Sequence, residues 1–227
     1  MSREPDIELT ANGRATRGYL ARSAGDGPWP GVVVIQEWWG LVDHIKQVAD
    51  RFAETGFVAL APDLYHGVQA RQPDEAGRLM MALNIDGAAS DLSGAADFLL
   101  EHPAVTSRKV GTVGFCLGGQ LSLMAACVDT RIGACVDYYG VHPQIQPDFS
   151  KLASPVLGFF GGLDGFVTPD AVSALEQQIR QAGKSVEFHV YPDADHAFFN
   201  DSRPEVYHRA HAEESWKRML AFFHANL

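Results

Sequence analysis

One cysteine lies in a sequence context that could turn its thiol into a nucleophile. The segment Gly114-Phe115-Cys116-Leu117-Gly118 has the form G-x-C-x-G, with an apolar run before it and small residues after it. In the related G-x-S-x-G pattern the central residue occupies a strained strand-to-helix turn, and the glycines let strand and helix nearly touch. A helix N-terminus also favours a thiolate. The pattern predicts that Cys116 attacks a carbonyl carbon and that the N–H of Leu117 donates to the resulting oxyanion.

Two further residues could complete a catalytic triad. Asp164 follows the apolar run 156–161, and His196 follows the run 186–191. Residues just past the carboxyl ends of parallel strands meet at one edge of the sheet, and the order nucleophile, acid, histidine is that of enzymes with such a turn. His196 would take the proton of Cys116, and Asp164 would fix the histidine tautomer. Asp170 is a rival acid, but it falls in the first turn of a predicted helix, where its charge has a structural use.

These residues need a parallel sheet to bring them together, and the chain has the alternation that predicts one. Helical patterns after residue 43, in 72–100 with a break near 84–87, and at 120–126, 169–182 and 204–226 separate the later apolar runs. We expect Asp43 to cap the first helix, and Gly56 and Gly183 to end two of them. Strands are predicted at 7–10, 15–21, 32–35, 57–60, 109–115, 134–139, 156–161 and 186–191, the first two joined as a hairpin through Ala11-Asn12-Gly13.

The predicted fold class is α/β, with a mostly parallel central sheet of about eight strands and helices on both faces. No linker or repeat divides the chain, so residues 1–227 are expected to form one α/β-hydrolase domain.

Composition narrows the possible partners and location. A net charge of −10 disfavours binding to nucleic acid or to an anionic membrane. The N-terminus has no apolar signal core, no stretch is long enough to span a membrane, and the three cysteines include no C-x-x-C pair. We therefore expect a cytoplasmic protein in which Cys127 and Cys135, which lie among apolar or small residues, are buried thiols.

The loop after the strand at 32–35 carries the next candidates. It reads Gln36-Glu37-Trp38-Trp39-Gly40, and in this fold that loop supplies the second oxyanion N–H, here that of Trp38. Glu37 would place a carboxylate beside the nucleophile. With this loop the chain resembles the dienelactone hydrolases, which are carboxymethylenebutenolidase-like enzymes, over nearly its whole length. The motifs that carry the resemblance are Gln36-Glu37, Pro62-Asp63-Leu64-Tyr65, Gly114-Phe115-Cys116-Leu117-Gly118-Gly119, Tyr138-Tyr139-Gly140-Val141, Gly161-Gly162-Leu163-Asp164 and Asp195-His196-Ala197-Phe198.

The resemblance implies a Cys116–His196–Asp164 triad that acts on enol-lactone or related ester bonds of a small molecule, without a cofactor. It also implies that Glu37 is catalytic, because it contacts the resting thiol and helps to generate the thiolate when substrate arrives. Tyr139 would line the pocket, which Trp38, Trp39 and Phe199 would make more aromatic.

The chain departs from the family at two arginines that bind a substrate carboxylate there. Phe199-Asn200 and Pro73 stand at or near those positions. Arg71, Arg78 and Arg203 are close in sequence but do not match them, so a neutral or bulkier ester fits the residues as well as the carboxylated lactone.

Three other classes remain as alternatives. A non-catalytic small-molecule binding protein could use the same fold. A cysteine amidase of the glutaminase kind also places cysteine on a strand-to-helix turn, but Phe198 stands where glutaminases commonly have a glutamate. A metal-dependent hydrolase is disfavoured because the chain has no H-E-x-x-H motif or clustered His/Asp ligand set, and no metal is expected.

Overall fold

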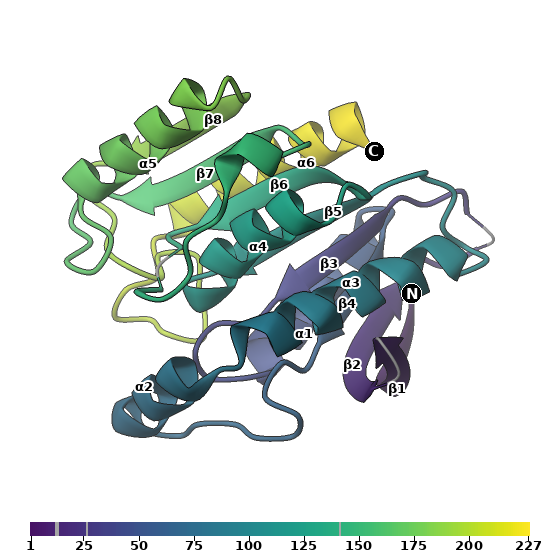
Figure 1. Cartoon of the computed structure of the whole chain (residues 1–227). Helices are drawn as coiled ribbons and strands as arrows, with labels where there is room; N and C mark the ends of the chain where they lie inside the picture. The colour runs from purple at the N-terminus through teal and green to yellow at the C-terminus, as the bar shows by residue number, and fades with distance from the viewer. Residues whose placement is uncertain (12–13, 26, 141) are drawn as a thin grey trace.

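The computed structural model describes residues 1–11, 14–25, 27–140 and 142–227, and its centre is one eight-stranded sheet (Figure 1). The strand order is β1-β2-β4-β3-β5-β6-β7-β8, and every pair from β4 onward is parallel. The strands are β1 (Ser2–Ala11), β2 (Arg14–Arg22), β3 (Gly31–Ile35), β4 (Val58–Pro62), β5 (Val110–Phe115), β6 (Ile132–Tyr138), β7 (Val156–Gly161) and β8 (Val186–Tyr191). This arrangement confirms the mostly parallel sheet of eight strands predicted from the sequence.

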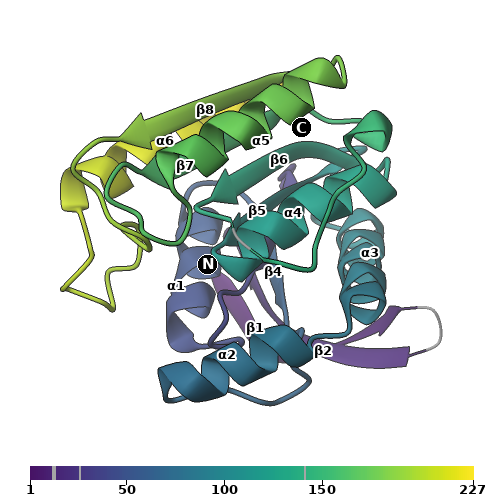
Figure 2. The same ribbon diagram turned by 60° about the vertical axis from the view of Figure 1, so that its left-hand side comes forward.

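Helices cover both faces of the sheet, as expected. The helices are α1 (Asp43–Glu54), α2 (Pro73–Ala82), α3 (Ile85–Glu101), α4 (Leu117–Val128), α5 (Pro169–Gln181) and α6 (Arg209–Asn226), with a short 3-10 helix at Phe149–Lys151. α1 and α6 pack on one face, where Phe52 of α1 contacts Trp216 and Phe223 of α6. α3 and α4 pack on the other face, so α1 and α3 appear on opposite sides of the sheet in Figure 2.

The two apolar layers explain why the inner strands are continuous hydrophobic runs. Every residue of β3, β4, β5, β6 and β7 is buried. A strand covered on both sides has no solvent-facing position for a polar residue. In β8, at the edge of the sheet, Val186 is buried but Glu187 and Val190 are exposed.

The opening hairpin is present, because β1 and β2 pair antiparallel. The predicted turn residues Asn12 and Gly13 lie outside the described part of the chain. β2 then pairs antiparallel with β4, which attaches the hairpin to the parallel sheet.

Three helix starts differ from the sequence prediction. α4 begins at Leu117 rather than at residue 120. Val42, not Asp43, is the N-cap of α1, and Asp43 is the first helical residue, where its charge still interacts favourably with the helix dipole. The last helix begins at Arg209 rather than at Pro204. The N–H of His208 donates to the carbonyl of Phe198 (2.9 Å), and this bond holds the chain against the preceding loop just before α6 begins.

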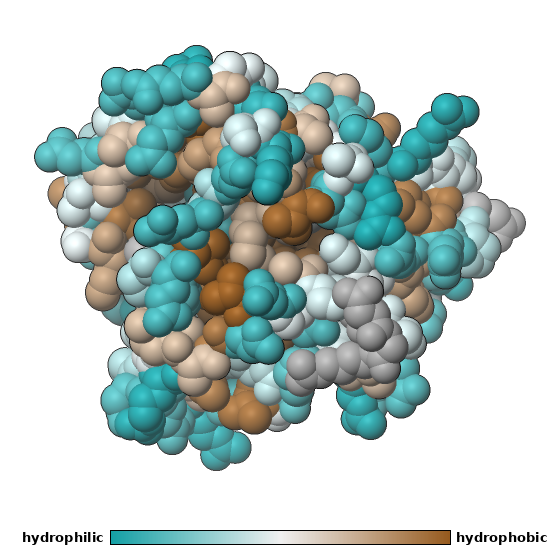
Figure 3. All heavy atoms as spheres, in the orientation of Figure 1, coloured by the Kyte–Doolittle hydropathy of each residue, from teal (hydrophilic) through white to brown (hydrophobic). Residues whose placement is uncertain are grey.

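The surface is mostly polar, but apolar side chains gather in a hollow near the middle of one face (Figure 3). Among the helices of the described residues, none is long and apolar enough to cross a membrane.

Candidate active site

Cys116 occupies a strained turn between β5 and α4. Its φ of 53° and ψ of −118° form a backbone conformation that residues with a Cβ atom rarely adopt. The Cys116 N–H donates to the carbonyl of Tyr138 (3.0 Å), and the Cys116 carbonyl accepts from the N–H of Gly119 (2.9 Å). These two bonds hold the turn, and strain maintained in this way is typical of functional residues.

The glycines of the motif are required by close backbone contacts. A Cβ on Gly114 would lie 1.8 Å from the carbonyl oxygen of Gly118. A Cβ on Gly118 would lie 2.5 Å from the carbonyl oxygens of both Ile35 and Gln36. The turn therefore abuts the end of β3, and the loop that starts at Gln36 lies directly beside the nucleophile candidate.

The predicted acid and base form a buried pair. His196 Nδ1 lies 2.7 Å from Asp164 Oδ2. The other oxygen of Asp164, Oδ1, accepts from the N–H groups of Phe166 (2.7 Å) and Val167 (2.9 Å), so the carboxylate cannot rotate without losing three bonds. Because Asp164 occupies Nδ1 of His196, Nε2 is the ring nitrogen that remains available to a thiol.

The pKa of His196 reports its surroundings. Burial alone lowers this pKa, but the hydrogen bond to Asp164 and the interaction with Cys116, together with the charges of both partners, raise it to about 10. His196 therefore favours the doubly protonated imidazolium at neutral pH, which is the state it would reach on taking the proton of Cys116.

The other two cysteines have a different environment. All three cysteines are free and buried. Burial raises the pKa of Cys127 to about 11 and that of Cys135 to about 12. Both thiols therefore stay protonated at neutral pH, in agreement with the core role predicted for them.

Glu37 is buried beside this site and has a partner that the sequence did not predict. Glu37 Oε2 accepts from Asn200 Nδ2 (2.8 Å), and Asn200 Oδ1 accepts from both the N–H and the hydroxyl of Ser202 (3.1 and 2.6 Å). The bonds to Ser202 fix which end of the Asn200 amide faces Glu37. Glu37 Oε1 is buried with no hydrogen-bond partner among the described residues. The structure thus pairs the carboxylate with Asn200, and the contact with the resting thiol implied by the resemblance stays a prediction.

Two tyrosines near Cys116 also have buried hydroxyl groups without a partner in the described part of the chain, Tyr65 and Tyr139. Burial, and then the charges of Glu37 and Cys116, raise the pKa of Tyr139 well above its ordinary value. Its ring centroid lies 5.0 Å from that of His196. Burial and the charge of Cys116 likewise raise the pKa of Tyr65. Both hydroxyl groups are neutral donors close enough to Cys116 to interact with its charge.

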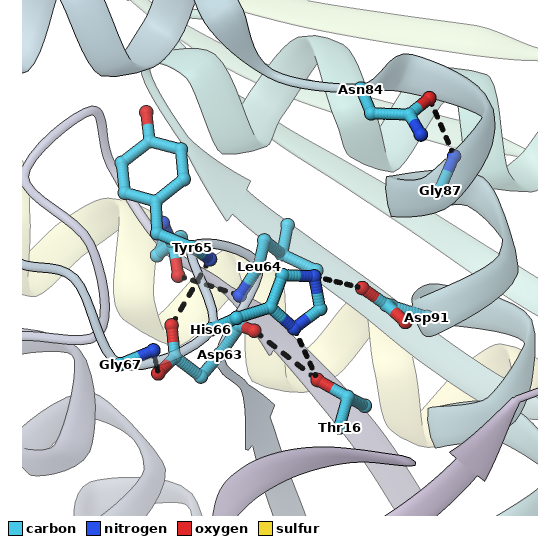
Figure 4. A network of polar contacts seen from close by, with 10 residues as sticks. Thr16, Asp63, Leu64, Tyr65, His66, Gly67, Asn84, Gly87 and Asp91 are labelled. Carbon is cyan, nitrogen blue, oxygen red and sulfur yellow. Dashed lines mark hydrogen bonds and ion pairs between the residues drawn. The ribbon is translucent and has the colours of Figure 1, made fainter. Parts of the chain in front are cut away.

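Figure 4 shows what holds Tyr65 in place. Asp63 accepts from the N–H groups of Tyr65 (3.1 Å) and Gly67 (2.6 Å), which closes the turn after β4. His66 lies between Thr16 (3.3 Å) and Asp91 (3.3 Å), which anchors the turn to β2 and α3. The Tyr65 hydroxyl points away from this network (Figure 4). Tyr65 belongs to the motif Pro62-Asp63-Leu64-Tyr65 that the chain shares with the family, but the sequence does not indicate that its hydroxyl lies near Cys116.

The remaining predicted site residues lie in three different places. Leu117 is the first residue of α4, and the first N–H groups of a helix have no partner within it. Trp38 and Trp39 follow Glu37 and pack edge to face, with ring centroids 5.2 Å apart. Phe199 is fully buried and stacks on Phe115, at 5.2 Å, within the aromatic core under α1 and α6. Phe199 thus packs in the core, where Tyr139 is equally buried, and its contact with a substrate stays a prediction.

A cavity of about 270 Å³ lies beside Asn200, the residue that donates to Glu37. Trp39 and Arg203 both line it. Arg203 is half-buried and pairs with Glu205 (2.9 Å), whereas Arg78 is exposed and pairs with Asp74 (2.9 Å). The positive charge of Arg203 also acts on the Tyr139 hydroxyl. Among Arg71, Arg78 and Arg203, which lie near the positions of the family's carboxylate-binding arginines, Arg203 is thus the one that lies next to Asn200 in the described structure.

Comparison with known proteins finds relatives that match nearly the whole chain. The chain is 38% identical to Protein usf of Aquifex pyrophilus over 224 residues, 96% of each chain. It is 34% identical over 224 residues to a protein of Aquifex aeolicus provisionally named carboxymethylenebutenolidase, again with 96% of each chain covered.

Solved structures share the fold over their full length. One from Klebsiella pneumoniae, provisionally named a dienelactone hydrolase, has a TM-score of 0.88 and 30% identity, covering 98% of this chain and 99% of its own. The dienelactone hydrolase-like promiscuous phosphotriesterase P91, from metagenomic libraries, has a TM-score of 0.88 and 26% identity over 99% of this chain and 98% of its own. The fold is therefore that of the α/β-hydrolases.

The family model for the dienelactone hydrolases matches residues 16–227. That range includes each of the residues described above. The chain therefore belongs to the dienelactone hydrolase family and is a hydrolase of carboxylic esters or lactones.

Proposed function

We propose that the chain hydrolyses its substrate through a Cys116–His196–Asp164 triad and an acyl-cysteine intermediate. The observation that carries this proposal is the combination of a strained Cys116 turn with a buried His196–Asp164 pair at 2.7 Å. Asp164 is held by backbone N–H groups, so the pair is ordered before substrate binds, as a catalytic site requires.

In the first half of the reaction, His196 Nε2 holds the proton of the thiol while the sulfur attacks the carbonyl carbon. The carbonyl oxygen becomes an oxyanion, which would accept hydrogen bonds from the N–H groups of Leu117 and Trp38. The bond between the carbonyl carbon and the leaving oxygen then breaks, and His196 donates its proton to that oxygen. The products are a thioester on Cys116 and an alcohol, which stays attached to the acyl group if the substrate is a lactone.

In the second half, His196 takes a proton from water, and the resulting hydroxide attacks the thioester carbon. The carbon–sulfur bond breaks, the carboxylic acid leaves, and the proton on His196 restores the resting site. Asp164 supports the imidazolium in both halves without taking the proton itself.

Glu37 and Tyr139 are proposed to bind and orient the substrate beside the sulfur. Each has a buried polar atom, Glu37 Oε1 and the Tyr139 hydroxyl, with no hydrogen-bond partner among the described residues. Buried polar groups normally have partners, so a bound substrate would supply them. Trp39 and Arg203, from the cavity beside Asn200, would contact the more distant part of a substrate.

The proposal is tested with p-nitrophenyl acetate, by comparing Cys116→Ala with the matched control Cys127→Ala. Cys127 is also buried, but burial raises the pKa of its thiol to about 11. We expect Cys116→Ala to lose at least about 10³-fold in kcat/KM, as removal of a triad nucleophile does, and Cys127→Ala to keep the wild-type rate. Equal rates for wild type and Cys116→Ala would refute the nucleophile assignment.

Substrate choice is tested with esters and lactones that differ only in a carboxylate, using wild type and Arg203→Gln. If a carboxylated substrate binds at Arg203, its KM rises in the variant while that of the neutral analogue does not. A panel in which wild type strongly prefers the carboxylated members, with Arg203→Gln unchanged, would contradict the place we give Arg203.

A further inference from the structure

Three side chains suited to a transition metal meet outside the active site, so the sequence prediction that the chain has no clustered His/Asp ligand set is wrong. Asp193 lies two residues after the end of β8, His208 is the N-cap of α6, and His211 is in its first turn. Figure 2 shows the start of α6 beside the end of β8. His211 Nε2 lies 2.7 Å from Asp193 Oδ1, and His208 Nε2 lies 3.4 Å from Asp193 Oδ2. One ligand atom of each of the three side chains lies within 4.8 Å of the other two.

Ring stacking holds both histidines in this arrangement. The His211 ring stacks on the Tyr191 ring, with centroids 4.4 Å apart and planes 20° apart. The His208 ring stacks on the His211 ring at 3.9 Å and 22°. Because the rings are nearly parallel and both Nε2 atoms face Asp193, little side-chain freedom remains to be lost when a ligand binds.

The charged side chains next to this cluster do not compete with His208 and His211 for the Asp193 carboxylate. Arg209, between the two in sequence, pairs with Glu213 at 2.7 Å. Arg218 and the Tyr191 hydroxyl both bond to Glu214. Arg209, Arg218 and Tyr191 thus each interact with a carboxylate other than Asp193.

We propose that Asp193, His208 and His211 bind one divalent transition-metal ion, with Zn²⁺ as a fitting example. Two imidazole nitrogens and one carboxylate are ligands that Zn²⁺ accepts, with water in the remaining position of a tetrahedral site. The exposed fraction of the Asp193 side chain is 65%, so water can reach the ion. Hard cations such as Mg²⁺ and Ca²⁺ prefer oxygen ligands and do not fit two imidazoles.

Metal binding costs two hydrogen bonds. The first is the bond between His211 Nε2 and Asp193 Oδ1 (2.7 Å), because a nitrogen that binds the metal carries no proton. The second is a helix-cap bond. His208 Nδ1 accepts from the N–H of His211 at 3.5 Å. A neutral imidazole bound to metal through Nε2 carries its proton on Nδ1, so this cap bond is lost. The distance of 3.5 Å exceeds the usual value of about 2.9–3.0 Å for an N–H···O hydrogen bond. This bond is therefore weak, and its loss costs little compared with the gain of two metal–nitrogen bonds.

The position of the site suggests what the metal does. Asp193 belongs to the loop that links β8 to His196, and both histidines belong to the start of α6. A metal would join these two segments and restrain the loop that carries the proposed base. This role is additional to the proposed triad and does not depend on it.

The test is calorimetric titration of Zn²⁺ into the full chain after removal of metal with a chelator. Cys116→Ala is used as the background, because a thiol next to His196 could bind Zn²⁺ by itself. We expect one ion per chain and a rise in the melting temperature with added Zn²⁺. His208→Ala combined with His211→Ala should weaken binding at least about 100-fold, and Asp193→Asn, which keeps the side-chain shape, at least about 10-fold.

The matched control is His224→Ala, which removes an exposed histidine from the last turn of the same helix. Its affinity for Zn²⁺ should equal that of the background. Circular dichroism of each variant without metal shows whether it folds. The proposal is overturned if the background binds Zn²⁺ more weakly than about 1 mM, or if a folded Asp193→Asn binds as tightly as the background.

Discussion

Replacing Cys116 by glycine should stabilise the protein relative to replacing it by alanine, although neither variant has a nucleophile. Backbone conformations that only glycine adopts freely cost other residues about 1–3 kcal/mol. At Cys116, φ is 53° and ψ is −118°. This ψ lies outside even the left-handed helical region, which other residues occasionally visit, so the upper end of that range applies. Alanine keeps the Cβ and the strain, whereas glycine removes both.

Two smaller effects oppose this gain. Glycine adds conformational entropy to the unfolded chain, at about 0.4–1 kcal/mol. It also gives up one buried methyl group, about 0.8 kcal/mol. What remains is an advantage of about 1.5 kcal/mol in the free energy of unfolding for Cys116→Gly over Cys116→Ala.

The assay is urea denaturation followed by tryptophan fluorescence, with both variants at one pH and temperature. The control pair is wild type and Ala174→Gly, at an exposed position inside α5, where glycine should lower the free energy by about 1 kcal/mol. If Cys116→Gly is no more stable than Cys116→Ala, the turn is not strained and the argument that the fold holds Cys116 in a functional conformation fails.

Other predictions concern buried carboxylates. Asn200→Ala removes the donor that lies 2.8 Å from the buried Glu37 Oε2 and should lower the free energy of unfolding by about 1–3 kcal/mol. In a double-mutant cycle with Glu37→Gln, the two effects should be non-additive by about 1 kcal/mol. Additive effects would show that the bond does not stabilise the site. Burial raises the pKa of Asp137 from 3.8 to about 7, opposed by a hydrogen bond from Gly140. The folded state therefore holds this proton more tightly than the unfolded chain, and stability falls as pH rises from about 4 to about 7. Asp137→Asn should remove up to about 4 kcal/mol of that loss, measured by urea denaturation at pH 4, 5.5 and 7.5; parallel pH profiles for variant and wild type would contradict this.

Much of the fold follows from the sequence because buried parallel strands leave a clear pattern. β7 and β8 begin and end at the predicted residues, and Thr168 caps α5 before Pro169 as proline at the first position suggests. The start of α6 could not be predicted in the same way. Pro204 and Glu205 resemble a helix start, but Val206 and Tyr207 only close a single turn onto Arg203, and His208 bonds to Phe198. That last bond depends on tertiary packing, which local patterns do not contain.

The site shows the same division. The order of Cys116, Asp164 and His196 along the chain was enough to predict a pair that the structure holds at 2.7 Å. The pairing of Glu37 with Asn200 joins residues 163 positions apart, and no local spacing reveals such a bond. The packing of Phe199 on Phe115 is likewise absent from local patterns, since the sequence does not indicate where the ring of a residue three positions after His196 will lie.

The most direct test of the proposed mechanism is to trap the acyl group itself. Wild type and His196→Gln are mixed with p-nitrophenyl acetate, quenched with acid within the first turnovers, digested and analysed by mass spectrometry. The account predicts one acetyl group per chain on the peptide that contains Cys116. In His196→Gln both the formation and the loss of this acetyl group should be slower, because His196 is the base in both halves of the reaction. Continued release of p-nitrophenol by wild type, with the Cys116 peptide never acetylated, would contradict the acyl-cysteine intermediate.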